Sequence, residues 1–435
     1  MTTTFSVEPG GSLHGDLRVP GDKSISHRSI MFGALAEGRT RVSGFLDGED
    51  CLATLAAFQA MGVPIEQPER QTVVIDGVGL NGLRKPPAPL DMGNSGTAMR
   101  LMCGVLAGQP FDSVLIGDAS LSRRPMRRVT GPLAEMGARI DTGENGTPPL
   151  HVHGGQRLRG HRHTLAVASA QVKSALLLAG LWSEGETCVT EPAPTRDHTE
   201  RMLTGFGYGL HRDGRRSCLR GGGRLGACAV EVPADISSAA FFLVGASIAE
   251  GSDLLLRHVG VNPTRTGAIE ILRLMGAAIE VLDPREIGGE PVADLRVRSA
   301  PLRGVRIPRE LVPSAIDEFP ALFVAAACAE GETVLAGAEE LRVKESDRIQ
   351  VMADGLAGLG VRCEVLPDGI RIRGRAALDA GTITSHGDHR VAMAFAMAAL
   401  RARGPIVIRD CDNVATSFPG FAGLAAGAGL GIRVT

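Results

Sequence analysis

One composite pattern occurs six times along this chain of 435 residues, and it constrains the fold more than any other feature. In each copy a β-rich run leads to a polar start and an apolar helix, and a second run and a second helix follow. The helix starts read KSISHRSIMFGALAEG, NSGTAMRLMCGVLAG, SAQVKSALLLAGLWSEG, DISSAAFFLVGASIAEG, DEFPALFVAAACAEG and DHRVAMAFAMAALRARG. Starting at residues 23, 94, 169, 235, 317 and 388, they lie 71, 75, 66, 82 and 71 residues apart. This regular spacing predicts one structural unit per interval.

The chain length predicts how the repeats are grouped, because 435 residues are too many for one ordinary core. We predict an α/β protein with two lobes, each containing three βαβαββ-like repeats. The first lobe spans residues 23–234, and the second combines residues 1–22 with 235–435 and so holds both termini. The first 22 residues would supply the strands that the sixth repeat lacks. The chain would cross between lobes near residues 20–23 and 231–235.

Composition excludes several classes of partner. The hydrophobic content of 44% and charged content of 22% are typical of a soluble globular protein. A formal net charge of -2 provides no long-range attraction for nucleic acid or a membrane surface, so any anion site must be local. No secretory leader opens the chain and no apolar stretch reaches membrane-spanning length, which predicts a cytoplasmic protein.

The cysteines give no sign of a metal or disulfide framework. The eight cysteines include no C-x-x-C pair and lie mostly within apolar runs. We predict that they are reduced core residues.

Charged and small residues gather at the helix starts of the first half, where free backbone N–H groups favour anions. Each of four groups also has a purely structural explanation. In the order in which the groups are given below, these explanations are a solvated turn, a turn that needs glycine, a solvated arginine face, and polar side chains bonded to neighbouring backbone. The groups are Lys23, Ser24 and Arg28; Gly93 and Gly96; Arg123, Arg124, Arg127 and Arg128; and Ser169, Gln171 and Lys173.

The second half contains further candidates. Asp317 is equally consistent with a helix N-cap and with a catalytic carboxylate. The run LRVKESDRI carries Arg342, Lys344, Glu345, Asp347 and Arg348, for which a surface ion-pair network is the alternative.

Histidine pairs could suggest a metal, but the residues around them do not favour one. His386 and His389 are accompanied by a single nearby carboxylate, Asp388, so we predict no metal there. The pairs His151/His153 and His161/His163 alternate on expected strands, and we predict that they are surface pairs.

Nine segments together resemble the 5-enolpyruvylshikimate-3-phosphate synthase family of enolpyruvyl transferases, in the family's order and across essentially the whole chain. They are GDKSISHR, GNSGTAMR, SRRPM, SAQVKSA, TRDHTE, DEFP, RVKESDR, GDHRVAM and ATSFP. The resemblance implies two lobes, each an inside-out barrel of three βαβαββ units with the helices inside. It also implies transfer of the enolpyruvyl group of phosphoenolpyruvate to the 5-hydroxyl of shikimate 3-phosphate, by addition and then elimination of phosphate, on the route to chorismate and aromatic amino acids.

The resemblance assigns site residues by matching position. Those implied for shikimate 3-phosphate are Lys23, Ser24, Arg28, Ser169, Gln171, Arg196, Asp317 and Lys344. Those implied for phosphoenolpyruvate are Lys23, Gly96, Arg124, Gln171, Arg348 and Arg390. Asp317 would accept a proton, and Glu345 with Lys23 or Lys344 would donate one. No metal or organic cofactor is implied, and we expect a monomer.

Two positions bear on affinity. Many family members have lysine where this chain has Thr416, which removes one expected cation for phosphoenolpyruvate. Gly96 matches the form associated with inhibition by glyphosate, while other features resemble a tolerant branch; we therefore expect intermediate sensitivity.

Two other functions are weighed against this one. The related transferase acting on UDP-N-acetylglucosamine typically has a reactive cysteine where this chain reads SRRPM, and the missing nucleophile disfavours it. A non-catalytic binding protein for phosphorylated metabolites would gain nothing from Asp317 and Glu345 beside an anionic ligand.

Overall fold

The structure is a computed structural model that describes residues 2–435, and it divides into two compact units. Unit 1 contains residues 2–20, Pro233–Glu286 and Pro291–Thr435. Unit 2 contains Gly21–Val232 and the short segment Ile287–Glu290. Each unit has a hydrophobic core of its own.

Unit 2 contains three four-stranded sheets, with strand orders β14-β3-β5-β4, β6-β7-β9-β8 and β10-β11-β13-β12. The strands of the first sheet are β3 (Glu37–Ser43), β4 (Ile65–Glu69), β5 (Thr72–Val78) and β14 (Ala229–Glu231). Those of the second are β6 (Leu90–Asp91), β7 (Ser113–Ile116), β8 (Arg139–Asp141) and β9 (Leu150–His153). Those of the third are β10 (Arg162–Thr164), β11 (Glu186–Thr190), β12 (Leu210–Asp213) and β13 (Arg216–Arg220).

The helices of unit 2 alternate with these strands. They are α1 (Lys23–Leu35), α2 (Glu49–Ala60), α3 (Gly96–Ala107), α4 (Arg127–Glu135), α5 (Ala170–Gly180) and α6 (His198–Gly205), with the short 3₁₀ helices η1 (Leu121–Arg123) and η2 (Glu144–Gly146).

Unit 1 contains the sheets β16-β17-β15-β2, β18-β20-β19 and β21-β22-β1-β23. The strands of the first are β2 (His14–Leu17), β15 (Asp253–Gly260), β16 (Ala278–Ile287) and β17 (Glu290–Arg298). The second has β18 (Glu332–Leu335), β19 (Arg362–Leu366) and β20 (Gly369–Arg373). The third has β1 (Phe5–Val7), β21 (Gly381–Thr384), β22 (Ile406–Arg409) and β23 (Ile432–Val434).

The helices of unit 1 follow the same alternation. The α-helices are α7 (Ile236–Ile248), α8 (Gly267–Leu274), α9 (Val312–Ala315), α10 (Phe319–Ala327), α11 (Arg348–Gly358), α12 (His389–Ala398) and α13 (Phe421–Ala428). The 3₁₀ helices are η3 (Arg309–Leu311), η4 (Glu339–Val343), η5 (Ala399–Arg401) and η6 (Asp412–Thr416).

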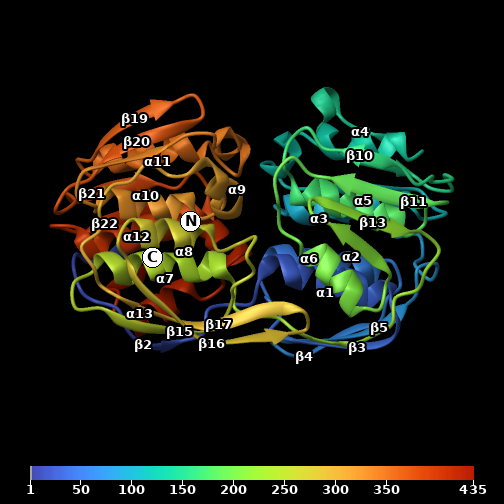
Figure 1. Ribbon diagram of the computed structural model, residues 1–435, viewed down its shortest axis with the longest axis horizontal. Helices are drawn as coiled ribbons and strands as arrows, with labels where there is room; N and C mark the ends of the chain where they lie inside the picture. Colours follow the sequence, from blue (N-terminus) through green and yellow to red (C-terminus); the bar gives the residue numbers. More distant parts are fainter. Residues whose placement is uncertain (1) are drawn as a thin grey trace. The chain divides into compact units, whose positions relative to one another are not determined.

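The first helix of each repeat is buried, while the second exposes one face. All residues of α7 and α10 are buried, as are nine of the ten in α12, because these helices are apolar on every side. Figure 1 shows α7, α10 and α12 in the interior of unit 1, with strands along its outside. By contrast, α4 buries only Val129 and Leu133. The predicted repeat is therefore confirmed, with its apolar helices inside and its sheets outside.

The terminal strands complete sheets that lie far from them in sequence. β1 pairs with both β22 and β23, which confirms that the N-terminus fills the sixth repeat. The prediction was wrong for β2, which pairs with β15 of the fourth repeat instead. β14, just before α7 in sequence, pairs with β3 of the first repeat. The pairing of β2 with β15 and of β14 with β3 depends on contacts between strands that are distant in sequence, and no local sequence pattern predicts it.

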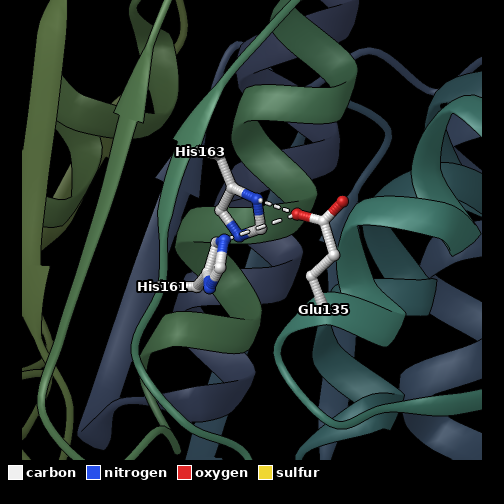
Figure 2. Close-up of side chains that lie close together, drawn as sticks. All are labelled: Glu135, His161 and His163. Carbon is white, nitrogen blue, oxygen red and sulfur yellow. Dashed lines mark ion pairs between the residues drawn. The ribbon is translucent and has the colours of Figure 1, made fainter.

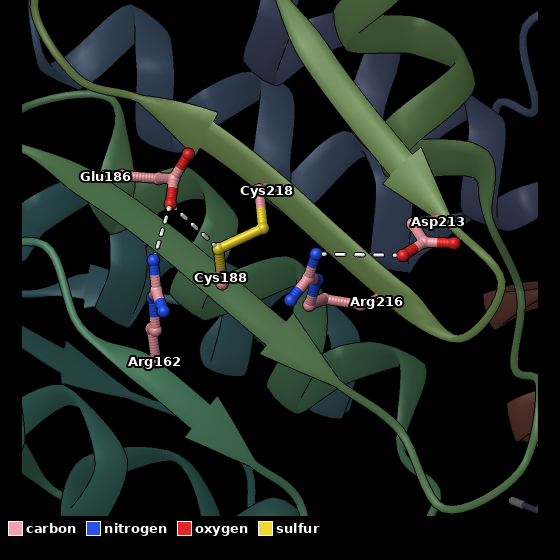
Figure 3. Close-up of a disulfide and its surroundings, with 6 residues drawn as sticks. All are labelled: Arg162, Glu186, Cys188, Asp213, Arg216 and Cys218. Carbon is pink, nitrogen blue, oxygen red and sulfur yellow. Dashed lines mark hydrogen bonds and ion pairs between the residues drawn. A yellow bond between two sulfur atoms is a disulfide. The ribbon is translucent and has the colours of Figure 1, made fainter.

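The prediction that all eight cysteines are reduced was wrong for one pair. Cys188 on β11 and Cys218 on β13 form a disulfide, drawn in Figure 3. The two residues are direct partners in the antiparallel register, so their Cα atoms lie 4.1 Å apart. The other six cysteines are free. A sequence separation of 30 residues gave no indication of this contact.

Within residues 2–435, none of the helices has the length and apolar character that crossing a bilayer requires.

Candidate active site

The start of α1 carries three of the predicted binding residues. Asp22 caps the helix by accepting a hydrogen bond from the Ile25 backbone N–H at 2.8 Å. Lys23, the first helical residue, forms an ion pair with the carboxylate of Asp50. Ser24 is buried in the same turn. This helix start therefore places one cation at the N-terminus of a helix, an arrangement suited to a phosphate.

Arg28 is buried one turn further along, with its guanidinium held on several sides. It donates to Thr199 Oγ1 at 2.7 Å, to Ser174 Oγ at 2.8 Å and to the Ser24 carbonyl at 2.9 Å. Burial lowers the pKa of Arg28 to about 10, with Glu200 opposing that fall and Arg196 adding to it. Arg28 therefore remains charged at neutral pH, and Arg196 lies within electrostatic reach of it.

A second group of candidates surrounds the start of α3, and we call Gly96, Arg100, Arg124 and Gln171 the α3 cluster. Arg124 is buried and donates to Asn94 Oδ1 at 2.7 Å. A Cβ at Gly96 would lie 2.9 Å from Nη1 of Arg100 and 3.2 Å from Nη1 of Arg124. Two guanidinium groups thus face the helix start at the one position that has no side chain.

The start of α5 joins the same cluster. Ser169 is its N-cap and accepts from the Val172 N–H at 3.4 Å. Gln171 accepts from Arg100 Nη1 at 2.7 Å and donates to Thr97 Oγ1 at 2.9 Å. The predicted residues Gly96, Arg124 and Gln171 are therefore brought together, with Arg100 between them.

Lys173 has different partners from those the sequence suggested. Its side chain is fully buried and contacts Glu191 at 2.7 Å and Glu200 at 2.8 Å. The pairing is with two carboxylates, not with neighbouring backbone, so Lys173 belongs to the internal framework of unit 2.

In unit 1 the candidates converge on one carboxylate, and we call Asp317, Lys344, Glu345, Arg348 and Arg390 the Asp317 cluster. Asp317 Oδ1 lies 3.3 Å from Lys344 Nζ and 3.6 Å from Arg348 Nη1. Glu318, not Asp317, occupies the N-cap position of α10. Asp317 therefore faces two cations, and the alternative in which it serves as the cap is wrong.

Arg348 is fully buried among carboxylates. It contacts Asp388 at 2.8 Å and Glu345 at 2.6 Å. Burial by itself lowers the pKa of Arg348, but attraction to Asp388, Glu345 and Asp317 outweighs burial and the pKa is raised. The pKa of Asp388 is lowered: burial opposes its ionisation, and the charge of Arg348 overcomes this. The pair is thus held in its charged form.

Arg390, on α12, contacts the backbone of Asp317. It donates to the Asp317 carbonyl at 2.9 Å and lies 3.7 Å from Glu318 Oε1. All five predicted residues of unit 1 are therefore brought together.

Thr416 lies at the end of η6 and is buried. Its hydroxyl donates to the Asn413 carbonyl at 2.7 Å, so it presents no cation.

Within residues 2–435, two groups of side chains have metal-ligand spacing, and neither includes His386 or His389. One is Glu135, His161 and His163; the other is Glu186, Cys188 and Cys218. The prediction that His161 and His163 are both surface residues was wrong for His163, which is 5% exposed because its strand β10 turns this side chain toward the core.

Two residues that contact these candidates, Arg100 and Asp50, were not predicted. Arg100 is four residues after Gly96, hence on the same helix face, and this spacing was a usable signal. Asp50 lies on α2, and only the packing of α2 against α1 brings it to Lys23.

Comparison with known proteins gives a consistent result. A family model described as EPSP synthase (3-phosphoshikimate 1-carboxyvinyltransferase) matches residues 7–424. The 3-phosphoshikimate 1-carboxyvinyltransferase of Alkalilimnicola ehrlichii is 70% identical over 428 residues, covering 98% of this chain and 96% of that protein. Its counterpart in Methylococcus capsulatus is 68% identical over 431 residues, covering 99% and 98%.

Solved structures agree. The EPSP synthase of Acinetobacter baumannii has a TM-score of 0.90 at 59% identity and covers 100% of both chains. The enolpyruvyl transferase NikO of Streptomyces tendae, 18% identical with a TM-score of 0.79, shares the fold. The predicted α/β class and inside-out barrel fold are confirmed by these matches. The chain belongs to the EPSP synthase family, the 3-phosphoshikimate 1-carboxyvinyltransferases.

Proposed function

We propose that the α1 start, the α3 cluster and the Asp317 cluster bind the substrates and perform the family's reaction in this chain. As an EPSP synthase, the chain is a transferase of the shikimate pathway, which leads to aromatic amino acids. The acceptor is shikimate 3-phosphate and the donor is phosphoenolpyruvate. Both are multiply charged anions, so bringing them together requires fixed cations that cancel their repulsion.

Shikimate 3-phosphate is assigned to residues that offer hydroxyl, amide and cationic donors. In unit 2 these are Lys23, Ser24, Arg28, Ser169, Gln171 and Arg196, and in unit 1 they are Asp317 and Lys344. Arg28 stays charged although buried, which suits it to an anionic group taken out of water. Arg196 is assigned to the phosphate.

Phosphoenolpyruvate is assigned to Lys23, Gly96, Arg124, Gln171, Arg348 and Arg390. Arginine forks match the geometry of its carboxylate and phosphate. Arg348 supports this assignment directly, because its buried Nη1 has no hydrogen-bond acceptor among the described residues. A buried donor of this kind is satisfied when an anion binds.

The chemistry needs proton transfer in both steps. In the addition, the 5-hydroxyl oxygen bonds to C2 of phosphoenolpyruvate while C3 gains a proton. In the elimination, C3 loses a proton and the bond from C2 to the phosphate oxygen breaks. We assign Asp317 as the proton acceptor and Glu345, with Lys23 or Lys344, as the donor set.

The position of Asp317 carries this proposal. Its side chain is 13% exposed, and Oδ1 lies 3.3 Å from Lys344 Nζ and 3.6 Å from Arg348 Nη1. A protein that only bound anions would be weakened by a carboxylate there, so the arrangement favours catalysis over binding alone.

The test measures phosphate release from phosphoenolpyruvate with shikimate 3-phosphate and, separately, with UDP-N-acetylglucosamine. We expect turnover with the first acceptor alone. In Arg124→Gln, loss of a charged donor worth about 1.5–3 kcal/mol should raise the KM for phosphoenolpyruvate roughly 10- to 150-fold. Arg128→Gln, an exposed change in the same arginine run, should match the wild type. Equal KM values in the two variants would remove Arg124 from the site.

Two expectations remain predictions. We propose a cytoplasmic monomer, and sedimentation of the purified chain checks its oligomeric state.

A further inference from the structure

Three side chains of unit 2 that are not assigned to substrates converge. Glu135 is the last residue of α4, His161 directly precedes β10 and His163 lies within it, as Figure 2 shows. The two histidines are two residues apart at the start of β10, and their ring centroids lie 4.6 Å apart. Arg162, between them, reaches Glu186 at 3.6 Å (Figure 3).

The backbone holds the three residues in place without any ligand. The His161 carbonyl accepts from the Cys188 N–H at 2.9 Å, and His163 pairs with Val189 in the β10–β11 ladder. The Met136 carbonyl, next to Glu135, accepts from the Arg159 N–H at 2.8 Å. The end of α4 and the start of β10 are therefore already adjacent.

The distances within this group match the edges of a metal coordination shell. Glu135 Oε2 lies 3.5 Å from His161 Nε2 and 3.2 Å from His163 Nδ1. Ligands about 2.0–2.1 Å from a tetrahedral zinc ion are separated by roughly 3.3 Å. One potential ligand atom from each residue lies within 4.8 Å of the other two.

Simple histidine–carboxylate pairs in the same unit are closer. The contact from His153 to Asp141 and that from His198 to Glu290 each measure 2.7 Å. The Glu135 oxygen instead lies 3.2–3.5 Å from a nitrogen of each of two imidazoles. This spacing leaves room for one cation bound by all three side chains.

Burial makes the group a partly closed site. His163 is 5% exposed, and its Nε2 has no hydrogen-bond partner within residues 2–435. The side chains of His161 and Glu135 are 45% and 57% exposed, so water can complete the coordination. In the other group of metal-ligand spacing, the disulfide occupies both sulfur atoms.

We propose that Glu135, His161 and His163 form a binding site for a divalent transition metal ion of the zinc type. Two imidazoles and one carboxylate suit zinc and related ions, whereas magnesium and calcium prefer oxygen ligands alone. The ion ties the end of α4 to β10. Because it binds the folded unit, it raises the thermal stability of the protein.

The test uses the full chain, stripped of metal and with the Cys188–Cys218 disulfide verified intact, titrated with zinc chloride by calorimetry. We expect about one zinc ion per chain. Glu135→Gln and His161→Gln, both changes of exposed side chains, should each weaken binding at least about 10-fold, since even outer-shell changes weaken metal sites 10- to 100-fold. His153→Gln is the matched control and should bind like the wild type.

Cobalt chloride provides a second readout. Bound cobalt should give the visible absorption of a low-coordinate site, and the Glu135 and His161 variants should lose it while remaining folded by circular dichroism. Absence of saturable zinc binding by the wild type would overturn the proposal. Binding of one zinc ion with equal affinity in the wild type and both variants would overturn it too, because the ion would then lie elsewhere.

Discussion

Arg348 is a proposed substrate-binding residue whose side chain is fully buried. Contacts with Asp388, Glu345 and Asp317 keep it charged, and they fix the guanidinium plane. Nη1 nevertheless has no hydrogen-bond acceptor among the described residues. The Arg348 side chain is already ordered and desolvated in the folded protein, so binding an anion would require little reorganisation of it.

Gly96 is the opposite case, because our assignment of this residue to the site rests on the absence of a side chain. A methyl group in Gly96→Ala would lie 2.9 Å from Arg100 and 3.2 Å from Arg124, so both guanidinium groups must shift. We predict a rise of about tenfold or more in the KM for phosphoenolpyruvate and in the glyphosate concentration that halves activity. Gly131→Ala, where a Cβ has open space, is the control. Unchanged inhibition in Gly96→Ala would contradict the assignment.

Lys173 offers a prediction about stability. Replacing it with methionine leaves Glu191 and Glu200 buried without their cation, which should destabilise unit 2 by about 3–5 kcal/mol. Thermal unfolding of Lys173→Met beside Lys85→Met, an exposed change, measures the effect. Adding Glu191→Gln and Glu200→Gln should recover most of the loss. A Lys173→Met protein as stable as the control would show that the buried triad contributes nothing.

At the scale of elements, the helix starts explain both what was predictable and what was not. Asp22, Ser95, Ser169, Asp235 and Asp388 cap α1, α3, α5, α7 and α12 with their side chains. Capping residues mark helix starts in sequence, so these could be located to within about two residues. The contacts between one helix start and the next depend on packing and were not predictable.

His27 connects α1 with α2 and with the start of α3, and its environment predicts a pH dependence of stability. Its Nδ1 lies 2.8 Å from Thr54 Oγ1 on α2, and its Nε2 lies 3.3 Å from Ser95 Oγ at the start of α3. Burial, and then the charges of Lys23 and Arg28, hold the pKa of His27 well below 6.5.

The direction of the effect follows from that depressed pKa. Below pH 6.5 the unfolded chain binds a proton that folded His27 rejects, so stability present at pH 7 is lost on acidification, by about 1.4 kcal/mol per pH unit. Urea unfolding at several pH values between 7 and 5 gives the free energy of unfolding as a function of pH. The slope of that plot should be shallower in His27→Gln than in the wild type by about 1.4 kcal/mol per pH unit. Exposed His211→Gln is the control. Equal slopes for His27→Gln and the wild type would mean that His27 takes up its proton in the folded state.

At the scale of the whole molecule, the repeat determined most of what the sequence could predict. Six apolar helix starts at regular spacing predicted six α/β repeats, and the nine family segments led to the site residues that we propose. Arg100 could also have been predicted from the sequence, since it lies one helical turn after Gly96. The Cys188–Cys218 disulfide, the burial of His163 and the placement of β2 were not, because strand register and packing between distant segments decide them.

The central claim is that Asp317 is the proton acceptor of an EPSP synthase, and Asp317→Asn tests it most directly. The amide keeps the shape of the side chain but cannot take up the proton. Steady-state phosphate release should show kcat reduced by about 100- to 10,000-fold, with half-saturation by shikimate 3-phosphate changed by no more than about tenfold. Asp347→Asn, a neighbouring helix cap, should remain near wild type. A kcat for Asp317→Asn within a few-fold of that control would contradict the account.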